Sequence, residues 1–519
     1  MSDKKIENLD HKGQSRRVFL EGAIAGGLAA SLSMYLGGCG DTIVTESSEK
    51  QIPKFSSNGK KPNVLIIFPD QLKTDVCGVY GGKNIRTDQI DRLAGEGAMF
   101  TAATSACPLC TPARGMLMTG CYPTHSGIIN NIIDPVPGQT YLGKVFKEAG
   151  YNTGYIGKMH LNSVKCNPSG HPEFTPPGER RHGFDHWEAN NCHGKFMPGS
   201  YFFYRDEPVA IISDKYETDK QTDQAISFME KNRKADEPFF LIMSPHPPHH
   251  PNDPESTPCG YLDRIPEDLW YAPNVPRDYL PNPGKGKRDW HLETRCYLAQ
   301  TKNLDDNVGQ LMSYLERSNL AENTIVLFFS DHGDMRGAHD CVGKQHPYRE
   351  GYQIPFFVRW PGKIRAGVKT DALVCHMDVM PTLCSLAGVP VPDGLDGVDF
   401  SKVLLGKSKD IDRDELLLAF YEPDYDMFKE WRAVLTKEYR YAKWLDGTEH
   451  LTSNLEDPYQ MNNLATQAKY ASVLQDMRER LARLLNAAHD EFLPGDEYKK
   501  WYDDNWRIIR TGRGAVANI

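Results

Sequence analysis

The sequence predicts an α/β fold in which a large doubly wound, mostly parallel sheet is flanked by helices, with a smaller C-terminal α+β subdomain. Two observations predict the sheet. Short apolar runs with the length of buried parallel strands occur at 64–68, 153–156, 239–243 and 325–329. Helical patterns separate these runs, as at 87–97, where Ile90, Leu93 and Ala94 share one face. Strands that alternate with helices are typical of this fold class.

The length and composition of the chain limit the class of protein further. The chain has 519 residues, of which 39% are hydrophobic and 25% are charged, and its net charge is −9. This length supplies a large buried core, and the composition is neither that of a disordered chain nor that of a fibrous one. The mild acidity is spread along the chain and excludes a general nucleic-acid binder. Twelve cysteines are too few for a disulfide scaffold of this size.

The N-terminal segment predicts export. Residues 15–20 form a twin-arginine pattern, and the apolar run at 23–36 is too short to span a bilayer comfortably. This run leads into Leu-Gly-Gly-Cys, which ends at Cys39 and resembles a bacterial lipobox. We predict a signal peptide with lipobox at 1–38, a lipid anchor on Cys39, a flexible tether at 39–61, and a periplasmic or cell-surface location reached through export machinery. The alternative is a plain signal peptide with Cys39 merely nearby.

A second boundary is predicted where proline and glycine gather, at 390–412. It separates a main domain, 62–405, from a C-terminal subdomain, 406–519. The subdomain contains two strand-like segments and an amphipathic helix, at 432–435, 439–444 and 472–488. This pattern predicts the α+β character of the subdomain.

Polar and titratable side chains follow each of the four predicted strands. They are Asp70 and Gln71, then Lys158 and His160, then His246, His249 and His250, and finally Asp331 and His332. Open α/β sheets place their sites at the carboxyl ends of their strands. A polar residue at one strand end would mean little, because loops are polar in general. Four such ends predict that these side chains meet in a single crevice.

The motif that begins at Cys110 predicts a reactive residue at the start of a helix. Pro112 suits a first helical turn, where its missing N–H would be unpaired in any case. Cys110 then lies at the helix N-terminus, where the dipole favours negative charge. Arg114 lies four residues on, near the same face, where it can neutralise an oxyanion. The plainer alternative is a buried cysteine beside a capping proline.

Four motifs carry a resemblance to a known family. They stand at 63–70, at Cys110-Thr111-Pro112-Ala113-Arg114, at Gly157-Lys158-Met159-His160 and at Ser330-Asp331-His332-Gly333. In this order they resemble the formylglycine-dependent sulfatases of the alkaline phosphatase superfamily, of the exported bacterial lipoprotein type. The resemblance covers 63–388 and continues more weakly to residue 465.

The resemblance implies that Cys110 is oxidised to formylglycine by a maturation enzyme. The hydrate of this aldehyde would be the nucleophile: one hydroxyl attacks sulfur and expels the alcohol. The second hydroxyl then loses its proton, the aldehyde reforms and sulfate leaves, so one hard step is divided into two. The implied substrate is a sulfate ester on a small molecule or, plausibly for this type, on a glycan.

The resemblance also implies one divalent cation, held by Asp70, Gln71, Cys110, Asp331 and His332. Ca²⁺ is common in the family and suits oxygen ligands. Gln71 stands where many members have a second aspartate, and His332 stands where many have asparagine. Because a nitrogen ligand suits Mn²⁺ or Zn²⁺ better, these two metals stay open beside Ca²⁺.

Three further roles are carried over from the matching motifs. Lys158 would bridge the nucleophile and a sulfate oxygen, and His160 would take the proton of the second hydroxyl. These two residues are two apart on a segment that we expect to be extended, which would point them to the same side. Lys344 matches a family lysine that contacts both sulfate and leaving group.

The proton donor to the leaving alcohol is assigned by the same comparison to His249. It best fits the family's Pro-His-x-Pro pattern, but His246 and His250 are close rivals. Together with Lys344, Arg114 and Lys158 concentrate positive charge that would stabilise a sulfuryl transition state.

Two alternatives stay open. The first is a phosphonate monoester or phosphodiester hydrolase of the same superfamily, because those enzymes also have glutamine and histidine at the positions of Gln71 and His332. A non-catalytic surface glycan-binding protein would keep Cys110 as a thiol, although binding alone does not need a proton donor such as His249. A two-zinc phosphatase is disfavoured, because the motif has Cys110 where that enzyme uses serine or threonine.

Overall fold

The computed structural model describes residues 60–135, 139–163, 171–276, 289–421 and 430–516. The predicted signal peptide at 1–38, the anchor at Cys39 and nearly all of the tether at 39–61 lie outside these ranges and stay predictions. The domain boundary drawn after residue 405 also stays a prediction. Among the described residues, no helix combines the length and the apolar composition that a membrane span requires.

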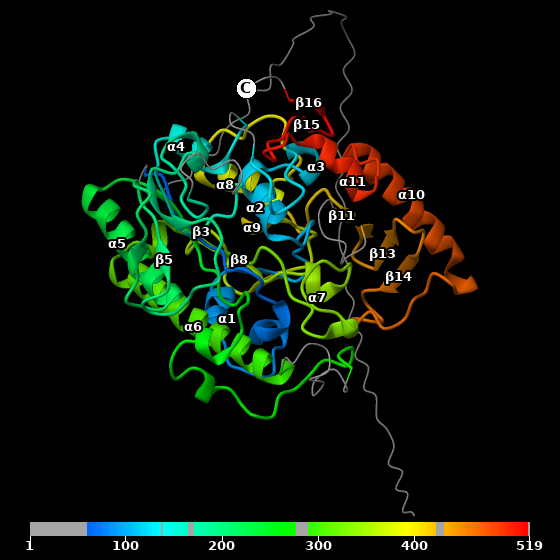
Figure 1. Ribbon diagram of the computed structural model, residues 1–519, viewed down its shortest axis with the longest axis horizontal. Coiled ribbons are helices and arrows are strands. Elements are labelled where there is room, and N and C mark those ends of the chain that lie inside the picture. Colours follow the sequence, from blue (N-terminus) through cyan, green and yellow to red (C-terminus); the bar gives the residue numbers. More distant parts are fainter. Residues whose placement is uncertain (1–59, 136–138, 164–170, 277–288, 422–429, 517–519) are drawn as a thin grey trace, which may run out of the picture. The chain divides into compact units, whose positions relative to one another are not determined.

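The main sheet has eight strands in the spatial order β10-β2-β9-β8-β1-β7-β3-β4 (Figure 1). Their bounds are β1 Asn63–Ile67, β2 Ala98–Phe100, β3 Asn152–Lys158, β4 His186–Asn190, β7 Phe239–Ser244, β8 Thr324–Phe329, β9 Phe356–Arg359 and β10 Val368–Thr370. Only β9 pairs antiparallel to its neighbours in this sheet. The four strands predicted from apolar runs are β1, β3, β7 and β8, so the doubly wound, mostly parallel sheet is confirmed.

Helices cover both faces of this sheet, as expected for alternating strands and helices. On one face lie α1 Asp88–Gly95, α5 Glu217–Ala235 and α6 Trp290–Arg317; on the other lie α2 Cys110–Thr119, α4 Leu142–Glu148 and α8 Val379–Ala387. Successive residues of β1 alternate between the two faces: Val64 and Ile66 join one apolar core, and Leu65 and Ile67 join the other. A strand buried on both faces explains why its sequence is apolar throughout.

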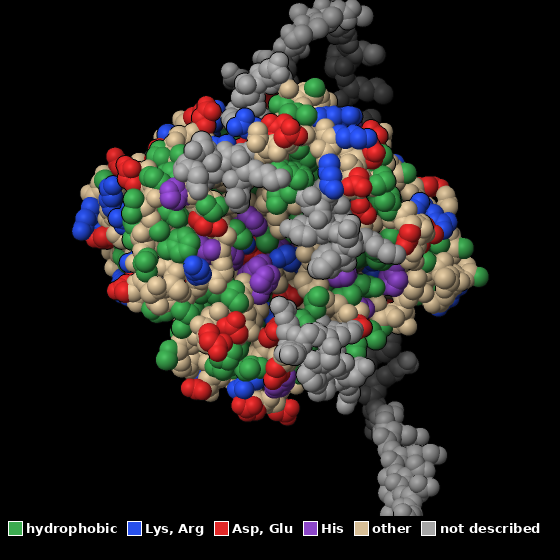
Figure 2. Space-filling view, in the orientation of Figure 1, with side chains coloured by type: hydrophobic (Ala, Val, Ile, Leu, Met, Phe, Trp, Pro, Cys, Tyr) green, Lys and Arg blue, Asp and Glu red, His purple; other side chains and the backbone are tan. Residues whose placement is uncertain are grey.

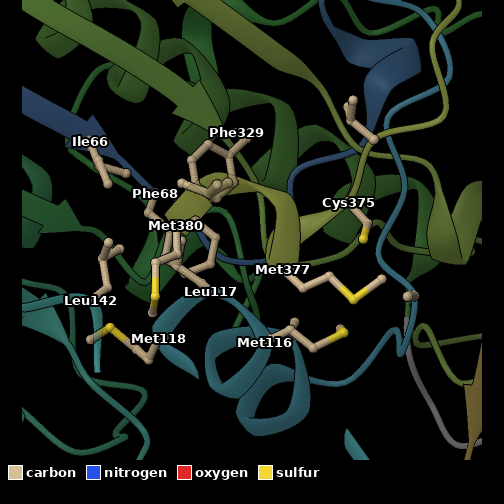
Figure 3. Close-up of a cluster of buried hydrophobic side chains, with 14 of the residues drawn as sticks. Ile66, Phe68, Met116, Leu117, Met118, Leu142, Phe329, Cys375, Met377 and Met380 are labelled. Carbon is tan, nitrogen blue, oxygen red and sulfur yellow. The ribbon is translucent and has the colours of Figure 1, made fainter. Parts of the chain in front are cut away.

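Helix α2 lies against the sheet with all ten residues buried. Its methionines and Leu117 pack below Phe68 and Phe329, which follow or end β1 and β8 (Figure 3). Pro112 falls in the first turn, as predicted, and Gly120 ends the helix with φ 67. Because the helix cannot shift in this packing, Cys110 at its first position is held at the carboxyl end of the strands.

A second sheet follows near the C-terminus (Figure 1). Its antiparallel strands are β11 Leu416–Phe420, β12 Trp431–Leu435, β13 Tyr439–Trp444 and β14 Glu449–Ser453. Helix α10, Ala471–Ala487, packs on it through Leu474, Met477 and Leu481. The smaller C-terminal α+β region is therefore confirmed.

The remaining elements are short. They are the helices α3 Pro123–Ser126, α7 Arg349–Tyr352, α9 Ser401–Leu404 and α11 Gly495–Tyr498, and the hairpins β5 Phe202–Phe203 with β6 Ile211–Ile212 and β15 Arg510–Thr511 with β16 Gly514–Ala515. Helix α7 matters for the site, because the loop that leads into it carries Lys344.

Candidate active site

The carboxyl ends of β8, β1, β7 and β3 lie side by side, since these strands are neighbours in the sheet. They bring the carboxylates of Asp70 and Asp331, the thiol of Cys110 and the imidazole of His332 together, with one donor atom of each within 4.8 Å of the others. All four side chains are buried. Figure 2 shows histidine and basic side chains gathered in the middle of the face viewed.

Asp70 is the electrostatic centre of this group. Its Oδ2 forms an ion pair with Lys158 Nζ at 2.6 Å and accepts a hydrogen bond from Arg114 Nη2 at 3.0 Å. Its Oδ1 lies 3.8 Å from the thiol sulfur of Cys110. Burial acts to raise the pKa of this carboxyl, but Lys158 and the other neighbouring cations bring it well below its usual range. Asp70 is thus an anion in the folded protein.

Asp331 is held in place by backbone donors. Its Oδ1 accepts from the N–H groups of Gln71 at 3.0 Å and His332 at 2.9 Å, and its Oδ2 accepts from Arg114 at 3.1 Å. Burial and the neighbouring Asp70 raise its pKa. Two carboxylates this close repel one another, and the Arg114 guanidinium contacts both, so a further cation between them would be favourable.

The orientation of His332 fits a metal site. Its Nδ1 lies 3.0 Å from the carbonyl oxygen of Gly333, so Nδ1 is assigned the proton and Nε2 keeps a free lone pair. That Nε2 faces Cys110 Sγ at 3.2 Å, Asp331 Oδ1 at 3.6 Å and Asp70 Oδ1 at 3.7 Å. Lone pairs of nitrogen, sulfur and two carboxylates therefore converge on one point. This donor set fits a divalent cation.

The side-chain amide of Gln71 donates one hydrogen bond and accepts another. Its Nε2 donates to Asp334 Oδ2 at 2.7 Å, and its Oε1 accepts from Lys344 Nζ at 2.8 Å. Its backbone φ of 62° lies in the left-handed region. The side chain therefore stands beside the acidic group and next to Lys344, and its predicted role as a metal ligand stays a prediction.

Arg114 and Lys158 bring fixed positive charge to the thiol. Lys158 Nζ lies 3.8 Å from Cys110 Sγ, and Arg114 Nη1 donates to the carbonyl of Lys158 at 2.7 Å and to Ser244 Oγ at 2.9 Å. Burial acts to lower the pKa of both groups. Asp331 and Asp70 nevertheless raise the pKa of Arg114, and Asp70 raises the pKa of Lys158, above the usual range. Both side chains are thus cations, positioned to bind an anionic substrate.

Of the three rival histidines, His249 is the one beside Lys344. Its Nε2 lies 3.2 Å from Lys344 Nζ and 4.0 Å from Asp70 Oδ1. His246 instead contacts the sulfur of Cys192 at 3.8 Å, and the ring of the exposed His250 lies tilted against that of His249, with the ring centres 3.9 Å apart. Burial and Lys344 lower the pKa of His249 well below its usual value. The geometry thus favours His249 over its rivals.

His160 does not lie on an extended segment, and this expectation was wrong. Strand β3 ends at Lys158, and His160 has φ 50°, in the left-handed region. Its carbonyl accepts from Thr111 Oγ1 at 2.8 Å, which ties the turn to helix α2. The alternation of a strand therefore cannot place His160 on the side of Lys158, and its predicted catalytic role stays a prediction.

Sequence reasoning missed several supporting residues. Ser244 holds Arg114, Asp334 holds Gln71, and Ser330 Oγ accepts from the N–H of Leu72 at 2.8 Å. Ser244 and Ser330 each directly follow a predicted apolar strand, so their position was a usable signal. Glu217 at the start of helix α5 carried no such signal.

Glu217 holds the start of the loop that carries His246, His249 and His250. Its Oε1 accepts from the backbone N–H of His246 at 2.9 Å and from Gln221 Nε2 at 2.9 Å. The side chain is fully buried, and burial raises its pKa to about 8. A carboxyl whose pKa is raised on folding stabilises the fold fully below the unfolded pKa and loses this contribution as the pH rises through about 8.

We therefore expect Glu217→Gln to flatten the pH dependence of stability. Wild type should lose on the order of a few kcal/mol in unfolding free energy between about pH 5 and about pH 8.5, and the variant should lose much less. Urea unfolding at both pH values measures this, with Glu255→Gln on the surface as a control. Parallel pH profiles of wild type and Glu217→Gln would contradict it.

Comparison with known families identifies both parts of the chain. The sulfatase family model matches residues 62–389, and the model of the C-terminal region of N-sulphoglucosamine sulphohydrolase matches residues 337–487. The ulvan-active sulfatase of Formosa agariphila is 33% identical over 92% of this chain and 90% of its own length. The endo-4-O-sulfatase of Bacteroides thetaiotaomicron is 30% identical over 85% of this chain and 95% of its own.

Solved structures agree with the fold. A structure from work on glycosaminoglycan metabolism by Bacteroides thetaiotaomicron superposes with a TM-score of 0.75 at 26% identity, covering 85% of this chain and 98% of that one. The phosphonate monoester hydrolase of Agrobacterium radiobacter, at 20% identity and a TM-score of 0.69, covers 88% of this chain and 100% of its own and shares the fold alone.

A doubly wound sheet that brings paired carboxylates, a thiol and cationic side chains to one point defines a hydrolase of the alkaline phosphatase-like superfamily. The chain belongs to the sulfatase family and is a sulfuric ester hydrolase. This finding confirms the resemblance to the sulfatases and disfavours the non-catalytic alternative, while the exported lipoprotein type stays a prediction.

Proposed function

We propose that this protein hydrolyses sulfate esters on a glycan, with formylglycine made from Cys110 as its nucleophile and one divalent cation beside it. The single observation that carries the proposal is the buried group of Asp70, Cys110, Asp331 and His332, ringed by cations. The glycan substrate is supported by the ulvan-active sulfatase and by the similar structure from work on glycosaminoglycan metabolism.

Asp70, Asp331 and His332 would hold the cation, with Gln71 beside them. The cation would supply Lewis-acid chemistry, and the hydrate at position 110 would supply a hydroxyl nucleophile. Ca²⁺ fits the carboxylates, while the nitrogen of His332 suits Mn²⁺ or Zn²⁺.

The other side chains divide the remaining work. Arg114 and Lys158 bind sulfate oxygens and stabilise the charge that develops on them. The His249–Lys344 pair, whose nitrogens are 3.2 Å apart, gives a proton to the leaving alcohol oxygen. His160 takes a proton during sulfate release, as the family motif implies.

The test compares ester classes with protein matured in the presence of a formylglycine-generating enzyme. We expect mass spectrometry of the Cys110 peptide to record an aldehyde in place of the thiol. We also expect kcat/KM for sulfated oligosaccharides to exceed that for phosphodiesters and phosphonate monoesters. A phosphodiester preference, or a fully retained thiol in active protein, would overturn the proposal.

We also propose that the protein is exported and anchored by lipid at Cys39. The twin-arginine pattern and the lipobox support this proposal. Cell fractionation of wild type and Cys39→Ala tests it: wild type should pellet with membranes and the variant should not. Equal release of both would contradict the anchor.

A further inference from the structure

A ring of contacts passes through His249 and Lys344, the two proposed proton donors, and Arg336 closes this ring. In order, the ring runs through Arg336, Asp334, Gln71, Lys344, His249, the carbonyl of Pro248 and Asn252. Arg336 touches none of the side chains that face Cys110 directly. Its position in the ring nevertheless connects the two segments that carry the proposed proton donors.

One arm of the ring orients Lys344. Arg336 Nε pairs with Asp334 Oδ2 at 3.0 Å, and this same oxygen accepts from Gln71 Nε2 at 2.7 Å. With its nitrogen turned to a carboxylate, the amide of Gln71 presents its oxygen to Lys344 Nζ, 2.8 Å away. Loss of Arg336 would free Asp334 to move, and the amide could then flip.

The other arm orients the loop that carries His249. Arg336 Nη2 donates to Asn252 Oδ1. The amide nitrogen of Asn252 donates to the carbonyl of Pro248 at 3.0 Å, directly before His249, and to Gln300 Oε1 at 3.1 Å. Arg336 therefore reaches His249 through Asn252 as it reaches Lys344 through Asp334.

Arg336 itself is held rigidly. Its guanidinium lies 4.3 Å from the centre of the Tyr297 ring, and its side chain is only 8% exposed. The Tyr297 hydroxyl donates to the carbonyl of Gln71 at 2.8 Å, so one tyrosine supports both ends of the Asp334 arm. The backbone of Arg336 has φ 43°, a strained conformation that the surrounding contacts must maintain.

We propose that Arg336 is a positioning residue for protonation of the leaving group, because it holds His249 and Lys344 at their mutual distance through Asn252 and Asp334. The inference rests on the proposed function, which gives these two side chains the proton-donating role. A displacement of about 1 Å at such a pair can cost on the order of 100-fold in rate.

The test uses the dependence of rate on the leaving group. The hydroxyl oxygen of a sugar needs a proton when it departs from sulfur, whereas 4-nitrophenolate is a stable anion and does not. We expect Arg336→Met to lower kcat for a sulfated sugar by about 10- to 100-fold and to change kcat for 4-nitrophenyl sulfate by less than about threefold. His249→Ala should produce the same selectivity with a larger loss, and Arg336→Lys should recover part of it.

Two controls separate positioning from folding. Arg264 is a matched arginine on the surface, with its guanidinium 4.6 Å from the Tyr261 ring and Nη1 2.8 Å from Asp306. Arg264→Met should affect neither substrate. Asn252→Ala opens only one arm of the ring and serves if Arg336→Met does not fold; it should show the same selectivity.

Equal losses on both leaving groups in the folded variants would overturn the positioning role of Arg336. A wild-type protein that cleaves no sulfate ester at all would instead overturn the proposed function, so the two failures are distinguishable.

Discussion

Replacement of Cys110 by alanine is expected to lower kcat/KM for sulfate esters by a factor of at least about 10³–10⁴. Cys110 is the side chain on which Asp70, Lys158 and His332 converge, at 3.8, 3.8 and 3.2 Å from its sulfur. Alanine leaves the cations and carboxylates in place but removes the residue from which the proposed nucleophile is made. Steady-state kinetics of matured wild type and variant measure the loss.

Cys384 supplies a matched control for this experiment. It is a fully buried cysteine in helix α8 and packs in the same apolar core as helix α2. Cys384→Ala removes a sulfur of equal size but should leave the activity unchanged. If Cys110→Ala kept more than about a tenth of the wild-type activity, the nucleophile would have to be a different residue.

Replacement of Asp70 by asparagine is expected to remove metal binding, to lower activity by at least about 10³-fold, and to cost about 3–5 kcal/mol of unfolding free energy in chelator. The carboxylate of Asp70 pairs with two fully buried cations, Lys158 at 2.6 Å and Arg114 at 3.0 Å. Asparagine preserves the size of the side chain but leaves Lys158 without a buried counter-charge. Urea unfolding and elemental analysis of bound metal measure the two effects separately.

Asp306 gives the contrasting case at the surface. It pairs with Arg264 at 2.8 Å, and both side chains are about one third or more exposed. Asp306→Asn should therefore cost less than about 1 kcal/mol and leave metal content unchanged. A stability loss at Asp70 no larger than that at Asp306 would mean that the acidic group is not an electrostatic centre of the fold.

The elements of the fold were predictable from local patterns. The four apolar runs became β1, β3, β7 and β8 with ends shifted by one or two residues, because a strand buried on both faces must be apolar throughout. The start of helix α2 was predictable from Pro112, because within a helix a proline ring is tolerated only in the first turn. The antiparallel direction of β9 had no local signal, since it depends on which neighbours the strand meets.

The candidate site was predictable to a similar depth. Asp70, Asp331 and His332 meet as expected, because the carboxyl ends of neighbouring parallel strands share one edge, and helix α2 brings Cys110 to the same place. The conformation of His160 was not predictable, because its left-handed backbone depends on a turn that Thr111 secures from another helix.

The sequence by itself determined the family, the order of the strands along the chain and the residue types to which we assign the chemistry, since these depend on composition, spacing and motif. Only the tertiary structure decided that His249 rather than His246 or His250 stands beside Lys344, and that Gln71 turns its amide between Lys344 and Asp334. The physical reason is that hydrogen bonds form at about 3 Å, a scale that sequence spacing cannot resolve for residues that lie 95 or more positions apart.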